Sequence, residues 1–282
     1  MKLASFKTAA GASWGVVLDG AIADTGAVLR ERFADLRAVI AADAMGVVAA
    51  AAATAPHHDL AAVTWLPVIP EPGKILCVGL NYETHRKETG RSEVGNPTIF
   101  SRFNNSQTGH LCPLPRPRVS MDFDYEGELA IVIGKPGRYI ARGDAMAHIA
   151  GFACYNDGSV RDFQRHTHQF TPGKNFPETG AFGPWMVTPD EMGAIGPQRL
   201  QTRVNGMVVQ DALLSQMIFD LPHQIEYCSS FTRLEPGDVI VTGTPGGVGS
   251  RREPPLWLKP GDVVEIEIDG VGLLRNPVTQ EA

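Results

Sequence analysis

Two glutamates, Glu126 and Glu128, stand one residue apart in the segment Asp-Tyr-Glu-Gly-Glu-Leu-Ala-Ile-Val-Ile-Gly, just before a run that is otherwise apolar. Side chains at positions i and i+2 of a strand point to the same face. Two carboxylates buried together are costly unless a positive charge lies between them. The pattern therefore predicts a bound divalent cation, with a solvated strand edge as the alternative.

A third acid, Asp157, follows another apolar segment, Gly-Phe-Ala-Cys-Tyr-Asn, at a strand end where the three side chains can converge. Oxygen ligands without Cys or His favour Mg²⁺, Mn²⁺ or Ca²⁺ over Zn²⁺ or Cu²⁺. Three protein ligands on an octahedral ion leave positions for water and substrate, so we expect catalysis. A non-enzymatic β protein stabilised by Ca²⁺ is the alternative, and it would need neither an open coordination position nor a water-activating pair.

His85 and Glu88 form a second candidate site, in a segment that predicts a strand, a turn and a short polar helix. At i and i+3 on one helical face, the carboxylate can orient the imidazole and raise its basicity. The other ring nitrogen is then left to deprotonate a water molecule. Solvent exposure of both side chains is the alternative that the spacing alone leaves open.

Arg161 and Gln164 are three residues apart, which places them on one side of a helical turn. Both are hydrogen-bond donors suited to an organic anion bound beside the metal. Arg can donate two parallel hydrogen bonds to a carboxylate, and Gln can donate to a carbonyl oxygen or water. Pairing of Arg161 with Asp162 or another surface acid is the alternative.

The glycine-rich segment Thr-Gly-Thr-Pro-Gly-Gly-Val-Gly, which begins at Thr242, lacks the spacing of a phosphate loop or a dinucleotide turn. Its backbone N–H groups, with the Thr244 hydroxyl, could hold a small carboxylate. An ordinary turn explains the same residues equally well.

The chain has 282 residues, of which 43% are hydrophobic and 20% charged, and this describes a globular protein with a sizeable core. A net charge of −6 without a basic cluster argues against nucleic acid and for a small-molecule partner. The four cysteines have no C-x-x-C spacing, so we expect neither zinc nor disulfides, and a reducing cytoplasm fits. No signal peptide or membrane-spanning segment is expected.

Residues 1–70 predict a small N-terminal α+β domain, with a strand at Trp14 and a helical alanine-rich stretch that Pro56 stops. The proline-rich segment 67–73 disfavours both helix and central strand, so it predicts a connector before a second domain at 71–282. That second domain is mostly β, and the overall fold class is α+β, mainly β. We predict its strands at 74–79, 129–134, 150–155, 185–188, 203–210, 239–242 and 263–268.

From about Lys74 to Pro277 the chain resembles the fumarylacetoacetate hydrolase family. The resemblance rests on an ordered series of motifs: Val-Gly-Leu-Asn-Tyr…His, Asp-Tyr-Glu-Gly-Glu-Leu-Ala, Asn-Asp-Gly-Ser-Val-Arg-Asp-Phe-Gln, Gly-Lys-Asn-Phe, Leu-Glu-Pro-Gly-Asp-Val-Ile and Thr-Gly-Thr-Pro-Gly-Gly-Val-Gly. It implies a catalytic domain built as a mixed β-sandwich roll, assembly as a homodimer, and often a lid that carries the histidine.

The resemblance also implies roles for individual residues. The metal ligands would be Glu126, Glu128 and Asp157, holding Mg²⁺ or Mn²⁺. The catalytic residues would be His85, Glu88, Lys174 and Gln164, and Arg161 would contact the substrate. From their own segments of the sequence we also expect Tyr82, Arg102 and Thr244 to bind substrate. Some members supply a fourth carboxylate just before the tyrosine of the first motif, where this chain has Asn81, so we expect three protein ligands.

The reaction implied is hydrolysis of a 2,4-dioxo acid of the acylpyruvate type, in aromatic or sugar-acid catabolism. Water activated by His85 would attack C4, and the C3–C4 bond would break to release pyruvate and a carboxylic acid. Decarboxylation of oxaloacetate and tautomerisation of an oxo acid need the same stabilised enolate and stay as alternatives. We expect Arg102 to bind a second carboxylate of the substrate.

Overall fold

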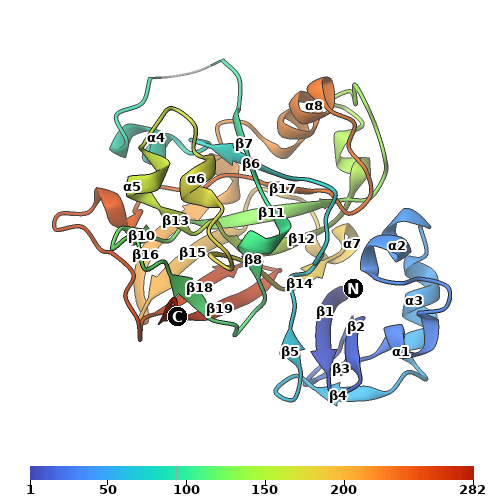
Figure 1. The fold of residues 1–282 in the computed structure, drawn as a ribbon. Helices are drawn as coiled ribbons and strands as arrows, with labels where there is room; N and C mark the ends of the chain where they lie inside the picture. The colour runs from blue at the N-terminus through green and yellow to red at the C-terminus, as the bar shows by residue number, and fades with distance from the viewer. Residues whose placement is uncertain (93–94) are drawn as a thin grey trace.

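The computed structural model describes residues 1–92 and 95–282, and a large mixed sheet runs through the molecule (Figure 1). This sheet has 12 strands in the order β4-β3-β2-β1-β14-β12-β11-β17-β6-β7, with β5 beside β1 and β8 beside β14. Its strands are β1 (Lys2–Thr8), β2 (Gly11–Val17), β3 (Ala21–Ala23), β4 (His57–Asp59), β5 (Thr64–Trp65), β6 (Ile75–Gly79), β7 (Thr98–Arg102), β8 (Gln107–Thr108), β11 (Gly127–Ile133), β12 (Ile149–Asn156), β14 (Gly180–Val187) and β17 (Val239–Val241).

A second sheet of five strands packs against β11, β12 and β14. Its strands, in spatial order, are β16 (Met207–Leu213), β15 (Arg199–Val204), β18 (Val263–Ile268), β19 (Gly272–Gln280) and β9 (Leu114–Arg116). A small pair, β10 (Phe123–Asp124) and β13 (Ser159–Val160), lies near the acidic segment. The predicted class, α+β and mainly β with mixed sheets, is confirmed.

Strand β11 lies at the centre of the molecule and is buried on both faces. Leu129, Ile131 and Ile133 belong to the core shared with the second sheet. Ala130 and Val132 point the other way, into the core shared with the N-terminal helices. Because both faces are covered, the strand is a continuous apolar run rather than an alternating one.

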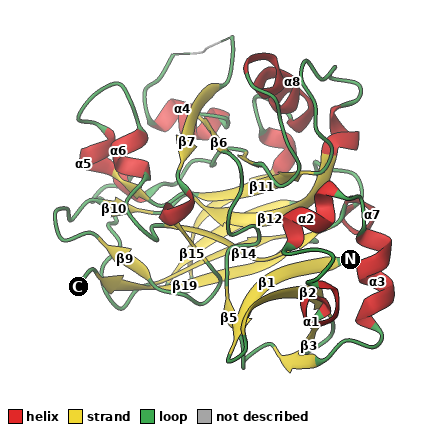
Figure 2. Ribbon diagram, turned by 45° about the vertical axis from the view of Figure 1, so that its right-hand side comes forward, coloured by secondary structure: helices red, strands yellow, loops and turns green. Residues whose placement is uncertain are grey.

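The helices are short and lie around the sheets (Figure 2). They are α1 (Thr25–Leu29), α2 (Leu36–Ala41), α3 (Met45–Ala52), α4 (Glu83–Glu88), α5 (Arg161–Gln164), α6 (Thr171–Lys174), α7 (Pro189–Met192) and α8 (Leu221–Phe231). Asp35 and Asp220 cap α2 and α8 by accepting backbone N–H groups of the first turn. Across the described residues, none of the helices has the length and apolarity needed to span a membrane.

The N-terminal strands continue the large sheet, because β1 pairs antiparallel with β14 through Lys2 opposite Val187 and Leu3 opposite Met186. The connector at 67–73 contains neither helix nor strand. The division into domains at residue 70 stays a prediction.

The predicted single strand at 203–210 is wrong. The structure has a hairpin there, in which β15 and β16 are joined by Asn205 and Gly206, with Val204 opposite Met207. Both turn residues have positive φ, 52° and 80°. Asn-Gly is the preferred pair for this two-residue turn, so the sequence carried the signal.

Candidate metal centre and active site

The start of β11 and the end of β12 bring three carboxylates together. Gly127 lies opposite Asn156 in this antiparallel pair. Glu126 and Glu128, on either side of Gly127, therefore lie close to Asp157, which follows Asn156. The three side chains offer oxygens within 4.8 Å of one another, and all three are buried. The predicted convergence of these acids is therefore confirmed, and their binding of a metal ion stays a prediction.

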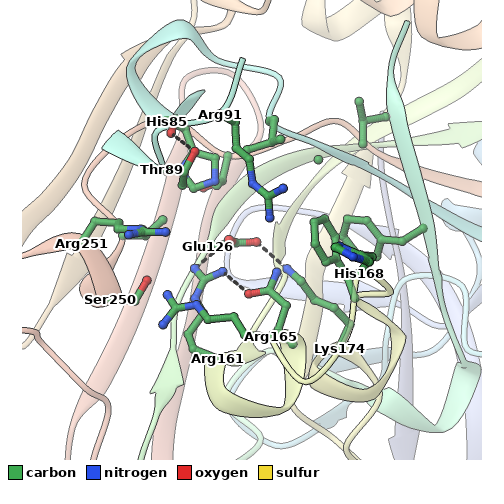
Figure 3. A pocket seen from close by; sticks show the side chains of 18 of the residues that line it. His85, Thr89, Arg91, Glu126, Arg161, Arg165, His168, Lys174, Ser250 and Arg251 are labelled. Carbon is green, nitrogen blue, oxygen red and sulfur yellow. Dashed lines mark hydrogen bonds and ion pairs between the residues drawn. The ribbon is translucent and has the colours of Figure 1, made fainter. Parts of the chain in front are cut away.

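Three buried cationic side chains surround the cluster. The ammonium Nζ of Lys174, at the end of α6, lies 2.6 Å from Glu126 Oε2 and 2.6 Å from Asp157 Oδ2. Arg161 Nη2 lies 2.7 Å from Glu126 Oε1, and Arg102 Nη1 lies 2.6 Å from Asp157 Oδ1. Figure 3 shows Lys174 and Arg161 approaching Glu126 from two sides. Two of the three carboxylates are thus already compensated by cationic side chains.

Glu128 differs from its neighbours, because no described cationic side chain pairs with it. One of its oxygens accepts the backbone N–H of Gly243. Burial, reinforced by the two nearby carboxylates, raises the pKa of Glu128 well above its usual value. Burial also acts to raise the pKa of Glu126, but the charges of Arg161 and Lys174 outweigh it and hold that pKa well below its usual value.

Charge and donor chemistry together fit a divalent cation. The buried charged groups of the centre are four carboxylates and three cations: Asp124, Glu126, Glu128 and Asp157, with Arg102, Arg161 and Lys174. With all four acids ionised, the centre is therefore one positive charge short, and the deficit lies at Glu128. A divalent ion would supply that charge and leave a net positive centre for an anionic substrate. An all-oxygen ligand set suits Mg²⁺ or Mn²⁺.

His85 and Glu88 lie on one face of α4, as their spacing predicted. His85 Nδ1 is 2.7 Å from Glu88 Oε1, and Glu88 Oε2 accepts the backbone N–H of Gly247 at 2.8 Å. A carboxylate only accepts hydrogen bonds, so Nδ1 carries the proton and Nε2 is left as a base. His85 is buried and lines the pocket. The contact within the pair is confirmed, and its catalytic role stays a prediction.

In the glycine-rich loop after β17, three backbone N–H groups donate hydrogen bonds to acidic side chains of the protein itself. The N–H groups of Gly243, Gly247 and Gly249 donate to Glu128, Glu88 and Asp124 respectively. Gly243 has φ 105°, and a Cβ there would lie 2.5 Å from the Cβ of Asn81. Asn81 donates to the carbonyls of Thr242 and Phe219, so it fixes the loop and does not face the acidic cluster.

Several predicted site residues line one pocket, with a cavity volume of about 430 Å³. Those in its wall are His85, Glu126, Glu128, Arg161, Gln164, Lys174 and Thr244. Gln164 Oε1 accepts a hydrogen bond from Arg161 Nη1 at 3.0 Å. The Thr244 hydroxyl donates to the Gly127 carbonyl at 3.0 Å, so its proton is already used inside the protein.

Tyr82 and Arg102 do not line the pocket, contrary to the expectation that they bind substrate. Arg102 is buried behind the cluster and donates to Asp157, Ser106 and Thr179. All of its nitrogens are engaged with the protein, so it positions Asp157 instead of reading a second substrate carboxylate. Tyr82 is buried too, and its hydroxyl has no hydrogen-bond partner in the part of the chain that the structure describes.

Asp124 is a site residue that the sequence analysis missed. It accepts Arg161 Nε at 2.8 Å and the backbone N–H groups of Gly249 and Ser250. It therefore holds Arg161 against Glu126. The spacing of Asp124, two residues before Glu126, continues the same-face alternation and could have revealed it.

Comparison with known proteins agrees with this fold. Residues 74–279 match the family described as fumarylacetoacetate (FAA) hydrolase C-terminal. The chain belongs to the fumarylacetoacetate hydrolase family, whose members include hydrolases, isomerases and tautomerases.

Three similar proteins indicate the range of reactions. A mitochondrial oxaloacetate tautomerase of Homo sapiens is 42% identical over 231 residues, covering 81% of this chain and 74% of that protein. A 2-hydroxyhepta-2,4-diene-1,7-dioate isomerase from Mycobacterium marinum has 30% identity and a TM-score of 0.77, covering 100% of this chain and 99% of that one. A maleylpyruvate hydrolase from Sphingobium sp. SYK-6, solved with manganese(II) and pyruvate, has 28% identity and a TM-score of 0.83, with both chains covered completely.

Replacing Arg161 by alanine should destabilise the protein by about 3–5 kcal/mol, because it leaves Asp124 and Glu126 buried without their shared partner. Denaturant unfolding of the metal-free protein measures this loss. Arg199→Ala, which removes an exposed pair with Asp211, is the matched control and should cost far less. Equal stability losses in the two variants would contradict the structural role given to Arg161.

Proposed function

We propose that this protein is a divalent-metal-dependent tautomerase that interconverts the keto and enol forms of oxaloacetate or a closely related 2-oxo diacid. The observation that carries the proposal is that His85, held by Glu88, lines the same pocket as Glu126 and Glu128 of the three-carboxylate cluster. The 42% identity to an oxaloacetate tautomerase supports this reaction over the hydrolysis that the motifs placed first.

Glu126, Glu128 and Asp157 would hold Mg²⁺ or Mn²⁺. Once bound, the cation would stabilise negative charge on the carboxylate and 2-oxo oxygens of the substrate. His85 Nε2 removes the proton from C3, because Nδ1 is occupied by Glu88. The Glu88 carboxylate stabilises the imidazolium that results. His85 then delivers the proton to the 2-oxygen, and the reverse transfer returns the enol to the ketone.

Hydrolysis of a 2,4-dioxo acid is the second candidate, since the same pair is equally suited to activate water. In that reaction water adds its oxygen to C4, the C3–C4 bond breaks, and C3 takes up a proton. The maleylpyruvate hydrolase with 28% identity supports this alternative. We also propose that the protein is cytoplasmic and forms a homodimer. Light scattering of the purified protein tests the oligomeric state.

The two reactions separate in one set of assays on the Mn²⁺-loaded protein. We expect faster decay of the enol absorbance of oxaloacetate, without release of CO₂ or pyruvate. Pyruvate release from a panel of 2,4-dioxo acids, with ¹⁸O from solvent water in the carboxylic acid product, would instead establish hydrolysis. Release of CO₂ from oxaloacetate as the main reaction would establish a decarboxylase. No turnover of any oxo acid would favour the non-enzymatic alternative.

A further inference from the structure

Three exposed arginines line the same pocket as the buried Glu126 and Glu128, and their positions define the rim of the pocket. Arg91 follows α4, Arg165 follows α5, and Arg251 ends the 3-10 turn η4 (Gly249–Arg251). Among residues 1–92 and 95–282, no carboxylate oxygen lies within 4.0 Å of their guanidinium nitrogens. Their guanidinium groups also donate no hydrogen bond to another described residue. Within the described part of the chain, the positive charge at this rim is therefore not neutralised by a paired acid.

Arg165 and Arg251 are close enough to repel each other. Partial burial of the Arg165 guanidinium lowers its pKa, and the charges of Arg161 and Arg251 lower it further. Asp122 and Asp124 act in the opposite direction, but neither forms an ion pair with Arg165. Holding like charges together costs free energy unless an anion binds between them. The clustered positive charge of the rim would therefore favour a bound anion.

The positions of these arginines indicate which part of a substrate would reach them. In Figure 3, Arg91 and Arg251 approach the space in front of Glu126 from different sides. A substrate whose 2-oxo acid end lies at the buried cluster extends its far end toward the rim. A cavity of about 430 Å³ has room for such a molecule. A guanidinium fork matches the geometry of a carboxylate, which makes a second carboxylate the best-suited group.

We propose that Arg165 and Arg251 bind the distal carboxylate of the substrate and make the enzyme selective for 2-oxo diacids over 2-oxo monoacids. The inference rests on the proposed function only in placing the 2-oxo acid group at the acidic cluster. Arg91 adds positive charge from the facing wall. Arg102, which was expected to read this second carboxylate, is buried behind the cluster and cannot do so.

The test is a binding measurement, so it does not depend on turnover. Calorimetry on the Mn²⁺-loaded protein compares oxaloacetate, 2-oxoglutarate and 2-oxoadipate with 2-oxobutanoate, 2-oxopentanoate and 2-oxohexanoate. We expect at least one diacid to bind more tightly than its monoacid counterpart. The double variant Arg165→Gln/Arg251→Gln should weaken binding of that diacid by about 10–100-fold, because charged hydrogen bonds are lost. Its binding of the monoacid should not change.

Arg233→Gln is the matched control, since Arg233 is exposed, pairs with Glu235 and does not line the pocket. It should leave both affinities unchanged. Added salt should weaken binding of the diacid more than binding of the monoacid, because the rim is open to solvent. Equal affinities for every diacid and monoacid pair, or equal losses for both classes in the double variant, would overturn the inference. Failure of the tautomerase assay would refute the proposed reaction and leave this binding preference standing.

Discussion

Replacing His85 by alanine should lower turnover by about 10²–10⁴-fold while leaving Mn²⁺ binding intact. His85 lines the pocket, its Nδ1 is held by Glu88, and its Nε2 is left to move the proton. The side chain is not one of the three proposed metal ligands, so its loss removes the base without removing a carboxylate from the cluster. Steady-state assays with the best substrate, together with Mn²⁺ titration of the same preparation, measure the two effects separately.

Two further variants show whether the effect belongs to the pair. Glu88→Gln keeps the size of the side chain but removes its charge, so it should reduce turnover less than His85→Ala if Glu88 mainly orients the ring. His57→Ala changes an exposed histidine of the N-terminal segment and should be silent. Near-normal turnover of His85→Ala across the whole pH range would exclude His85 as the base.

The parts of the site that local patterns determine were predictable from the sequence. Glu126 and Glu128 share a strand face, and His85 and Glu88 share a helical face, so their spacing fixes their geometry. Asp157 could be added because it directly follows an apolar segment. The spacing fixes the geometry within each of these two pairs, whereas Asp157 joins the glutamates because β11 pairs with β12.

The side chains that arrive from distant segments were not predictable in the same way. Lys174 was expected to contact substrate, but it bridges Glu126 and Asp157, the former 48 residues away in the sequence. Arg102 was expected in the distal pocket, but β7 turns it inward. No periodic pattern marks Arg165 or Arg251 as neighbours, because the loops that carry them approach each other only in the folded chain.

The fold shows the same limit. Single strands such as β11 and β12 were predictable from apolar runs, but the pairing of β1 with β14 joins segments far apart in the sequence. The hairpin at Asn205 and Gly206 was missed although its turn signal is local. Connectivity of the sheet depends on long-range packing, which the pattern of a single segment does not encode.

Replacing Glu128 by glutamine should markedly weaken Mn²⁺ binding without unfolding the metal-free protein. Of the three proposed ligands, Glu128 is the one that no described cation compensates, so a bound divalent ion would interact with it most directly. Chelator treatment of the wild-type protein should abolish turnover, and Mg²⁺ or Mn²⁺ should restore it. In Glu128→Gln the restored rate should stay low, and Mn²⁺ affinity measured by calorimetry should fall by more than about 10-fold, because a charged ligand is lost.

The pH dependence of stability gives an independent check on the same residue. The folded-state pKa of Glu128 is raised above its ordinary value of 4.5 by burial and by the two neighbouring carboxylates. Above pH 4.5 the folded state therefore binds more protons than the unfolded state at this group, so its contribution to stability falls as pH rises. Denaturant unfolding of the metal-free wild type should show this loss of stability, and Glu128→Gln should reduce it.

Glu126→Gln should instead destabilise the metal-free protein, because Lys174 and Arg161 lose a charged partner. Unchanged Mn²⁺ affinity in a folded Glu128→Gln protein would show that the ion, if one binds, lies elsewhere.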